Sequence, residues 1–156
     1  MTIQWGYHFF TGIRDVDHQH EGLVALVNNL NAVATCHTST DEVENAFLKL
    51  TDYASEHFSL EEKLMVEAGV DVDHVAAHKQ AHTRFVDQLT DMWHARGEDP
   101  DATTQHLLEF LTTWIYRHIL ITDHAMARDY YNKKGMTPPP SLLMTSESSR
   151  SPGKAA

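Results

Sequence analysis

Histidine is the residue type through which this sequence is best equipped for chemistry, with 12 histidines among 156 residues and one cysteine. Several of them repeat at the four-residue step that places side chains on one face of a helix. Glu61 follows His57 at this step, as do His78 and His82 after His74. Imidazole is the commonest neutral metal ligand and the usual proton-transfer group near neutral pH. We therefore asked whether these side chains are gathered around one site.

The histidines fall on the apolar faces of four amphipathic stretches. His20 shares a face with Leu23, and His118 shares one with Leu111. Asp123 follows His118 by five residues, which is roughly 140° around an ideal α-helix. We expect Asp123 to approach a shared centre from a different angle. The candidate metal ligands are His20, His57, Glu61, His78, His82, His118 and Asp123.

Five imidazoles and two carboxylates are difficult to bury without a cation. Each unpaired polar group costs about 1–3 kcal/mol, and a domain has a net stability of only about 5–15 kcal/mol. The set is too large for one tetrahedral zinc ion and suits two first-row metals bridged by carboxylates. Donors without thiolate favour iron, with zinc and manganese as alternatives. No histidine has a glutamate three residues before it, and no His-Glu-x-x-His motif occurs, which disfavours ferritin-like centres and zinc proteases.

Two choices of ligand stay open at this point. His74 competes with His82 as the partner of His78, although His82 shares its apolar stripe with Phe85. His18 competes with His20 but lies about 200° around the helix from it. The other histidines are expected on the surface or in loops: His8, His37, His94, His106 and His124.

These ligands require four helices, which the apolar periodicity predicts over residues 17–34, 40–68, 73–96 and 101–133. Ser39 and Glu42 have capping-box spacing. Gly69, Gly97 and Gly135 mark helix ends, and Asp99 with Pro100 marks a start. Short connections predict an all-α, antiparallel up-down-up-down four-helix bundle. An aromatic N-terminal arm, residues 1–16, is expected to pack over it.

Composition narrows the class of protein further. The formal net charge is −10, which argues against binding to nucleic acid or to an anionic membrane surface. No apolar run reaches the roughly 18 residues of a membrane span, and the N-terminus does not resemble a signal peptide. Cys36 is the single cysteine, so we expect a reducing, cytoplasmic location. We expect one domain over residues 1–135 and a flexible tail or linker over residues 136–156.

Several segments resemble the hemerythrins, in particular bacterial hemerythrin domains. The resemblance covers roughly residues 3–131 and is carried by Trp5 and by the segments DVDHQHEGL, HFSLEE, HKQAHTRF and WIYRHILITD. It implies a four-helix bundle that holds two non-heme iron ions joined by an oxo or hydroxo bridge. It also implies that His78, His82 and His118 bind one iron, that His20 and His57 bind the other, and that Glu61 and Asp123 bridge the two.

The resemblance further implies reversible dioxygen binding at an open position of the iron held by two histidines. The apolar residues within one turn of the ligands are expected to wall this position, excluding water and slowing autoxidation, or else to be ordinary core residues. They are Leu23, Phe58, Trp114 and Ile121. We expect an oxygen or redox sensor domain that is not an enzyme. Its ligand is dioxygen or another small diatomic molecule, and its tail would lead to a signalling output domain. The alternatives are a stand-alone oxygen carrier, a di-metal enzyme and an iron store.

Overall fold

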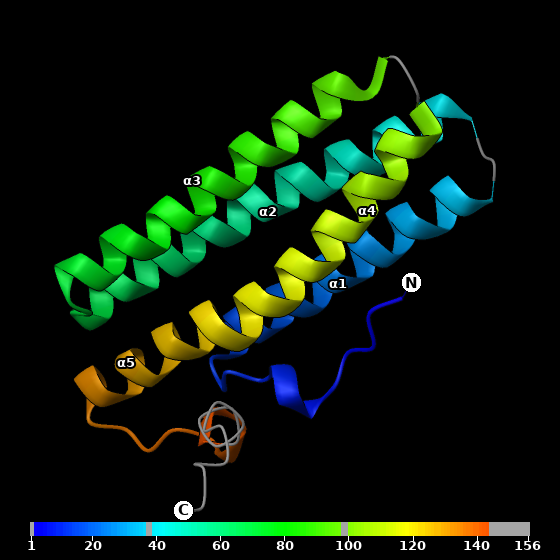
Figure 1. Ribbon diagram of the computed structural model, residues 1–156. Coiled ribbons are helices and arrows are strands. Elements are labelled where there is room, and N and C mark those ends of the chain that lie inside the picture. Colours follow the sequence, from blue (N-terminus) through cyan, green and yellow to red (C-terminus); the bar gives the residue numbers. More distant parts are fainter. Residues whose placement is uncertain (1, 37–38, 98–99, 144–156) are drawn as a thin grey trace, which may run out of the picture.

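The computed structural model describes residues 2–36, 39–97 and 100–143, and the described chain contains helices and no strand. Figure 1 shows long helical rods that alternate in direction, so the predicted antiparallel all-α bundle is confirmed. We use rod for each of the four long helical stretches: α1, α2, α3 and the stretch formed by α4, η3 and α5. The last rod is continuous, because the backbone angles remain helical from α4 through η3 into α5. The elements are η1 (Tyr7–Phe9), α1 (Arg14–Thr35), α2 (Thr40–Ala68), α3 (Val72–His94), η2 (Ala95–Gly97), α4 (Pro100–Arg117), η3 (His118–Asp123) and α5 (His124–Lys134).

Local signals set several helix ends as predicted. The Ser39 hydroxyl accepts from the Glu42 amide, and the Glu42 carboxylate accepts from the Ser39 amide, which completes a capping box. Gly69 and Gly135 end α2 and α5 with φ values of 75° and 65°, a conformation that glycine adopts without steric cost. The predicted start at Asp99 lies outside the described residues.

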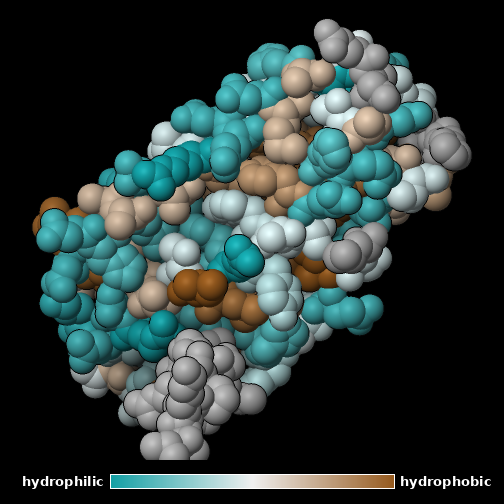
Figure 2. All heavy atoms as spheres, in the orientation of Figure 1, coloured by the Kyte–Doolittle hydropathy of each residue, from teal (hydrophilic) through white to brown (hydrophobic). Residues whose placement is uncertain are grey.

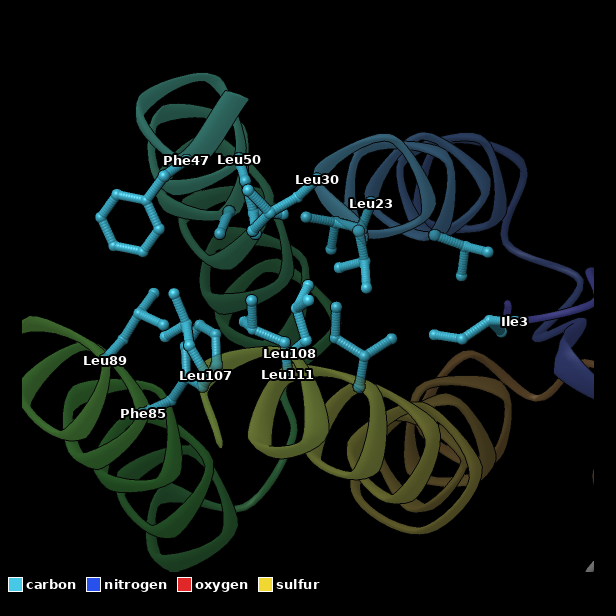
Figure 3. Packing of buried hydrophobic residues seen from close by; sticks show 14 of the residues in the cluster. Ile3, Leu23, Leu30, Phe47, Leu50, Phe85, Leu89, Leu107, Leu108 and Leu111 are labelled. Carbon is cyan, nitrogen blue, oxygen red and sulfur yellow. The ribbon is translucent and has the colours of Figure 1, made fainter. Parts of the chain in front are cut away.

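The core consists of two apolar clusters, one toward each end of the bundle. Figure 3 shows the larger cluster, in which side chains of all four rods meet on the bundle axis, among them Leu30, Leu50, Phe85 and Leu111. The smaller cluster includes Met65. Each rod passes from one cluster to the other, so the residues between the clusters lie at a common level of the bundle.

The N-terminal arm packs against the bundle as predicted. The Trp5 and Phe9 rings stack with centroids 5.1 Å apart, and Phe9 is fully buried. The buried Asp17 carboxylate accepts hydrogen bonds from the backbone amides of Thr11 at 2.8 Å and Gly12 at 3.0 Å. The arm is therefore attached to the start of α1 through the Asp17 carboxylate.

The chain remains packed beyond the expected domain boundary at residue 135. Leu142 is fully buried in the smaller cluster, and the buried Ser141 hydroxyl donates to the Phe10 carbonyl at 2.8 Å. Residues 136–143 thus differ from the expected flexible tail, because Leu142 packs in the smaller apolar cluster and Ser141 donates a hydrogen bond to the arm backbone. The rest of the expected tail, residues 144–156, lies outside the described residues.

The surface visible in Figure 2 is mostly polar, in keeping with the composition of the chain. Figure 2 shows a face that is mostly hydrophilic, with small separate apolar areas. Among the helices described, none is both long enough and apolar enough to cross a membrane.

Candidate metal centre

A layer of buried histidine and carboxylate side chains crosses the bundle between the two apolar clusters. Their nitrogen and oxygen atoms form two overlapping groups that share Glu61 and Asp123. We call the group of five the five-residue half and the group of four the four-residue half. The five-residue half contains Glu61, His78, His82, His118 and Asp123, and the four-residue half contains His20, His57, Glu61 and Asp123.

Glu61 divides its two oxygens between the two halves. Its Oε1 atom lies 3.2 Å from Nε2 of His20 and 2.9 Å from Nε2 of His57. Its Oε2 atom lies 3.2 Å from Nε2 of both His78 and His82. One carboxylate thus faces four imidazoles with separate oxygens.

Asp123 divides its oxygens in the same way from the opposite side of the bundle. Its Oδ2 atom lies 2.9 Å from Nε2 of His20, on the four-residue half. Its Oδ1 atom lies 3.1 Å from Nε2 of His78 and 3.0 Å from Nε2 of His118, on the five-residue half. Each half therefore receives one oxygen from each carboxylate.

Ordinary helical periodicity places most of these side chains. His57 and Glu61 are separated by one α-helical turn on α2, as are His78 and His82 on α3. Residues four apart lie on the same helix face, so each pair points into the bundle together. His20 stands between the two clusters on α1, after Val16 and before Leu23.

A π-helical turn brings Asp123 to the same face as His118, which the sequence did not predict. Residues 118–123 form the π-helix η3, in which the His124 amide donates to the Ile119 carbonyl five residues earlier. Residues five apart in this turn therefore lie on the same face of the helix, and Oδ1 of Asp123 lies 3.0 Å from Nε2 of His118. The expectation that Asp123 would approach from a different angle assumed an ideal α-helix. Single π turns often occur at functional sites.

The spacing of the donor atoms matches the coordination shell of a first-row metal. Ligand atoms about 2.1 Å from such an ion and at right angles to one another are about 3 Å apart. The nitrogen-to-oxygen distances run from 2.9 to 3.2 Å. Nε2 of His57 and both oxygens of Asp123 are buried without a hydrogen-bond partner among the described residues. Convergent ligand atoms, several of which lack a hydrogen-bond partner in the described part of the chain, fit cations, and the layer is suited to a pair of iron ions.

In the absence of metal, the buried histidines and carboxylates of the layer strongly shift one another's pKa values. Burial lowers the pKa of both His20 and His78, but Asp123 and Glu61 outweigh it and raise each pKa to about 9. Burial raises the pKa of Glu61 and Asp123, yet the surrounding histidines hold both values well below the ordinary range for a carboxyl. The metal-free layer thus carries protons that a metal ion must displace.

Two polar neighbours orient site histidines and were missed in the sequence. Nδ1 of His57 lies 2.9 Å from Oε1 of Gln19, and Nδ1 of His82 lies 3.2 Å from Oε1 of Glu62. Gln19 precedes His20 and Glu62 follows Glu61 in the sequence. Their places next to a ligand in the sequence were the only hint of this role. Each contacts a histidine on another helix, so the contacts become evident only in the packed structure.

The competing histidines lie outside the layer. His74 is half-buried and pairs with Asp129 at 2.5 Å, and His18 is exposed. Of the histidines expected at the surface, His8, His94 and His106 are exposed, and His37 lies outside the described residues.

His124 is a correction to the sequence analysis, which expected it at the surface. The side chain is fully buried, and its Nε2 donates to the Phe9 carbonyl at 3.3 Å. Burial lowers its pKa. The π turn before it and the arm above it enclose this ring, and neither could be read from helical periodicity.

Three of the four apolar residues singled out in the sequence are buried or half-buried, and the fourth is exposed. Leu23 and Phe58 are buried, and the Phe58 ring stacks on His82 with centroids 3.9 Å apart. Half-buried Trp114 stacks on His118 at 4.2 Å. Ile121 is 65% exposed, because the π turn directs it outward. It lines an open groove of about 640 Å³ with Trp114 and His118.

Comparison with known proteins agrees with this geometry. The family model described as the hemerythrin HHE cation binding domain matches residues 11–129. A bacteriohemerythrin of Stenotrophomonas maltophilia (strain R551-3) is 30% identical over 125 residues, which are 80% of this chain and 79% of the relative. A bacteriohemerythrin of Pseudomonas aeruginosa (strain LESB58) is 29% identical, with 75% and 74% covered. A hemerythrin-like protein of Naegleria gruberi is 27% identical, with 78% and 87% covered. With a matching family model across most of its length and its buried ligand layer, this chain belongs to the hemerythrin family.

Proposed function

We propose that this chain holds two non-heme iron ions with an oxo or hydroxo bridge and reversibly binds dioxygen at the four-residue half. The observation that carries the proposal is the unequal donor set around two shared carboxylates. One half has three histidines and the other has two. When bound, the iron pair supplies the site and the electrons for reversible dioxygen binding.

The residues of the chain account for the two positions. His78, His82 and His118 would hold one iron, and His20 and His57 would hold the other. Glu61 and Asp123 would offer one oxygen to each, in keeping with their alternating contacts. Because the four-residue half has fewer protein donors, it is the half with room for an external ligand.

Apolar side chains would protect this position from water. Leu23 lies on α1 one turn after His20 and is buried, and the centroids of the Phe58 and His57 rings are 5.9 Å apart. On the other half, Trp114 stacks on the His118 ring and covers part of it where His118 lines the open groove. An apolar wall slows proton delivery and water attack, so this surrounding favours reversible ligand binding over catalysis.

A sensor role is the favoured use of this chemistry, with a stand-alone carrier as the alternative. His124 follows the bridging Asp123 directly and donates to the arm at Phe9. Ser141 donates to the next arm residue, Phe10. A movement of Asp123 would therefore be transmitted through His124 to the arm at Phe9, and from Phe10 to Ser141 in the segment after α5. In a cytoplasmic sensor, this segment would lead to a signalling output domain.

The test is the absorption spectrum of the iron-loaded chain during cycles of deoxygenation and oxygenation. We expect a visible band that appears with oxygen, disappears when oxygen is removed and returns over several cycles. An iron store or a di-metal enzyme would not give this reversible band. A spectrum that does not respond to oxygen would contradict the proposal. Hydrogen exchange of residues 9–17 in the two states would then separate sensor from carrier, because only a sensor requires a structural difference.

A further inference from the structure

The two halves of the metal layer differ in the charge of the group that orients one of their histidines. On the five-residue half, Nδ1 of His82 faces a carboxylate oxygen of Glu62 at 3.2 Å. On the four-residue half, Nδ1 of His57 faces the amide oxygen of Gln19 at 2.9 Å. A histidine that presents the Nε2 lone pair to a metal carries its proton on Nδ1. Both rings therefore donate a hydrogen bond away from the centre, one to an anion and one to a neutral amide.

Packing keeps each of these contacts in place. The His82 ring is 3% exposed and stacks on Phe58 with an interplanar angle of 12°. The His57 ring is 1% exposed. By contrast, the Nδ1 atoms of His20 and His78 are buried without a hydrogen-bond partner in the described part of the chain. The Nδ1 atoms of His57 and His82 thus have a side-chain acceptor that those of His20 and His78 lack.

We propose that Glu62 and Gln19 are positioning residues that give the two iron positions unequal preference for the ferric state. This inference rests on the di-iron function proposed above. A carboxylate draws the Nδ1 proton toward itself and makes the imidazole a stronger donor, whereas an amide does so less. A stronger donor stabilises the more highly charged ion, so iron on the five-residue half gives up its electron first.

The effect belongs to the hydrogen bond rather than to the overall charge of the protein. The Glu62 side chain is 29% exposed, so its long-range field is partly screened by solvent. Glu56 provides a matched control, because it is an exposed glutamate on the same helix, α2. Replacing either residue with glutamine removes the same charge, but only Glu62 contacts a ligand ring.

The experiment is an anaerobic redox titration of the iron-loaded chain, followed by its absorption spectrum. Each of the two steps transfers one electron from a ferrous ion to the electrode or to a chemical mediator. We expect Glu62→Gln to raise the lower of the two midpoint potentials and thereby to narrow the separation between them. The expected change is about tenfold in the ratio of oxidised to reduced iron, which is about 59 mV for one electron.

A second variant tests the other half independently. Gln19→Glu places a carboxylate against His57, so it should lower the upper midpoint and also narrow the separation. Glu56→Gln should leave the separation unchanged. The inference is overturned if either site variant retains two irons and the wild-type separation, or if Glu56→Gln narrows the separation equally. Iron content, measured on the same samples, distinguishes failure of the proposed di-iron function from failure of this inference. Fewer than two irons in the wild type would overturn the proposed function as well, whereas two irons with an unaltered separation would overturn this inference alone.

Discussion

At the residue scale, the centre depends on two carboxylates that each face both halves. Glu61 comes from α2 and Asp123 from the end of η3, and both are fully buried. A buried carboxylate with no positively charged group or metal ion near it would strongly destabilise the fold. Here, each oxygen faces histidine nitrogens on a different half, so one side chain fixes both positions. Loss of either carboxylate should therefore affect both metals.

Replacing Glu61 with alanine should reduce bound iron from two ions to at most one per chain. The change removes the oxygens that face His20, His57, His78 and His82. Elemental analysis after desalting measures the ratio. Glu56→Ala, at an exposed position of the same helix, should keep two ions. Retention of two irons by Glu61→Ala would show that Glu61 does not bridge.

Replacing Leu23 with alanine should leave two irons bound but hasten autoxidation by about tenfold, the change that about 1.4 kcal/mol of barrier produces. Leu23 is buried one turn from His20, and its loss would admit water to the four-residue half. The rate is measured as the decay of the oxygen-dependent band in air. Ile121→Ala is the matched control, because this side chain is 65% exposed. Equal rates for the two variants would remove Leu23 from the dioxygen pocket.

At the element scale, the sequence predicted the rods better than the details within them. Apolar periodicity, the Ser39 capping box and the glycine ends are local features, and the helices follow them. The predicted ligands share faces through α-helical steps, with one exception. The five-residue step from His118 to Asp123 needs a π turn, which arises from packing and not from propensity. The same turn accounts for the outward Ile121, and together with the arm it encloses His124.

Deleting Ile121 should be tolerated, because it would convert the π turn into an ordinary α turn. His118 and Asp123 would then be four residues apart and would still share a face, and α5 would keep its register. We expect two irons and a cooperative thermal transition. Deleting Thr113, an exposed residue in α4, would instead rotate Leu111 and the residues before it by roughly 100°.

The two deletions thus form a matched pair on one helical rod. Deletion of Thr113 should lower the melting temperature strongly or prevent folding, since it moves several buried leucines away from the core. Equal loss of iron and stability in both variants would contradict the role assigned to η3. Circular dichroism and iron content together measure the outcome.

At the scale of the whole molecule, a polar layer divides one apolar core into two. Val16, Met65, Val75 and Met126 lie on one side of the layer, and the larger cluster lies on the other. The fold therefore has to hold charged groups at its centre even before metal binds. The pKa shifts of His20 and His78 to about 9 show how it does so.

Raising the pH should have opposite effects on the stability of the metal-free chain and on its metal affinity. The pKa values of His20 and His78 lie above the ordinary 6.5, so their contribution to stability is complete below about pH 6.5 and is lost as the pH rises through 9. Glu61 and Asp123 have lowered pKa values, so their contribution is lost only in acid. From pH 7 to 9.5 the metal-free chain should lose a few kcal/mol.

Metal affinity should increase over the same range, because fewer protons have to be displaced. With two protons released, the expected increase is up to about a hundredfold per pH unit below the histidine pKa values. Urea unfolding of the metal-free chain and competition titrations with zinc, which has no redox chemistry, measure the two quantities. Parallel changes in stability and affinity would contradict this description of the layer.

The most direct measurement is the number of iron ions held by each folded chain, determined by elemental analysis after anaerobic loading and desalting. Two groups of donors joined by Glu61 and Asp123 predict a ratio of two. A folded chain that binds one iron ion, or none, would contradict the central claim that this layer is a two-metal centre.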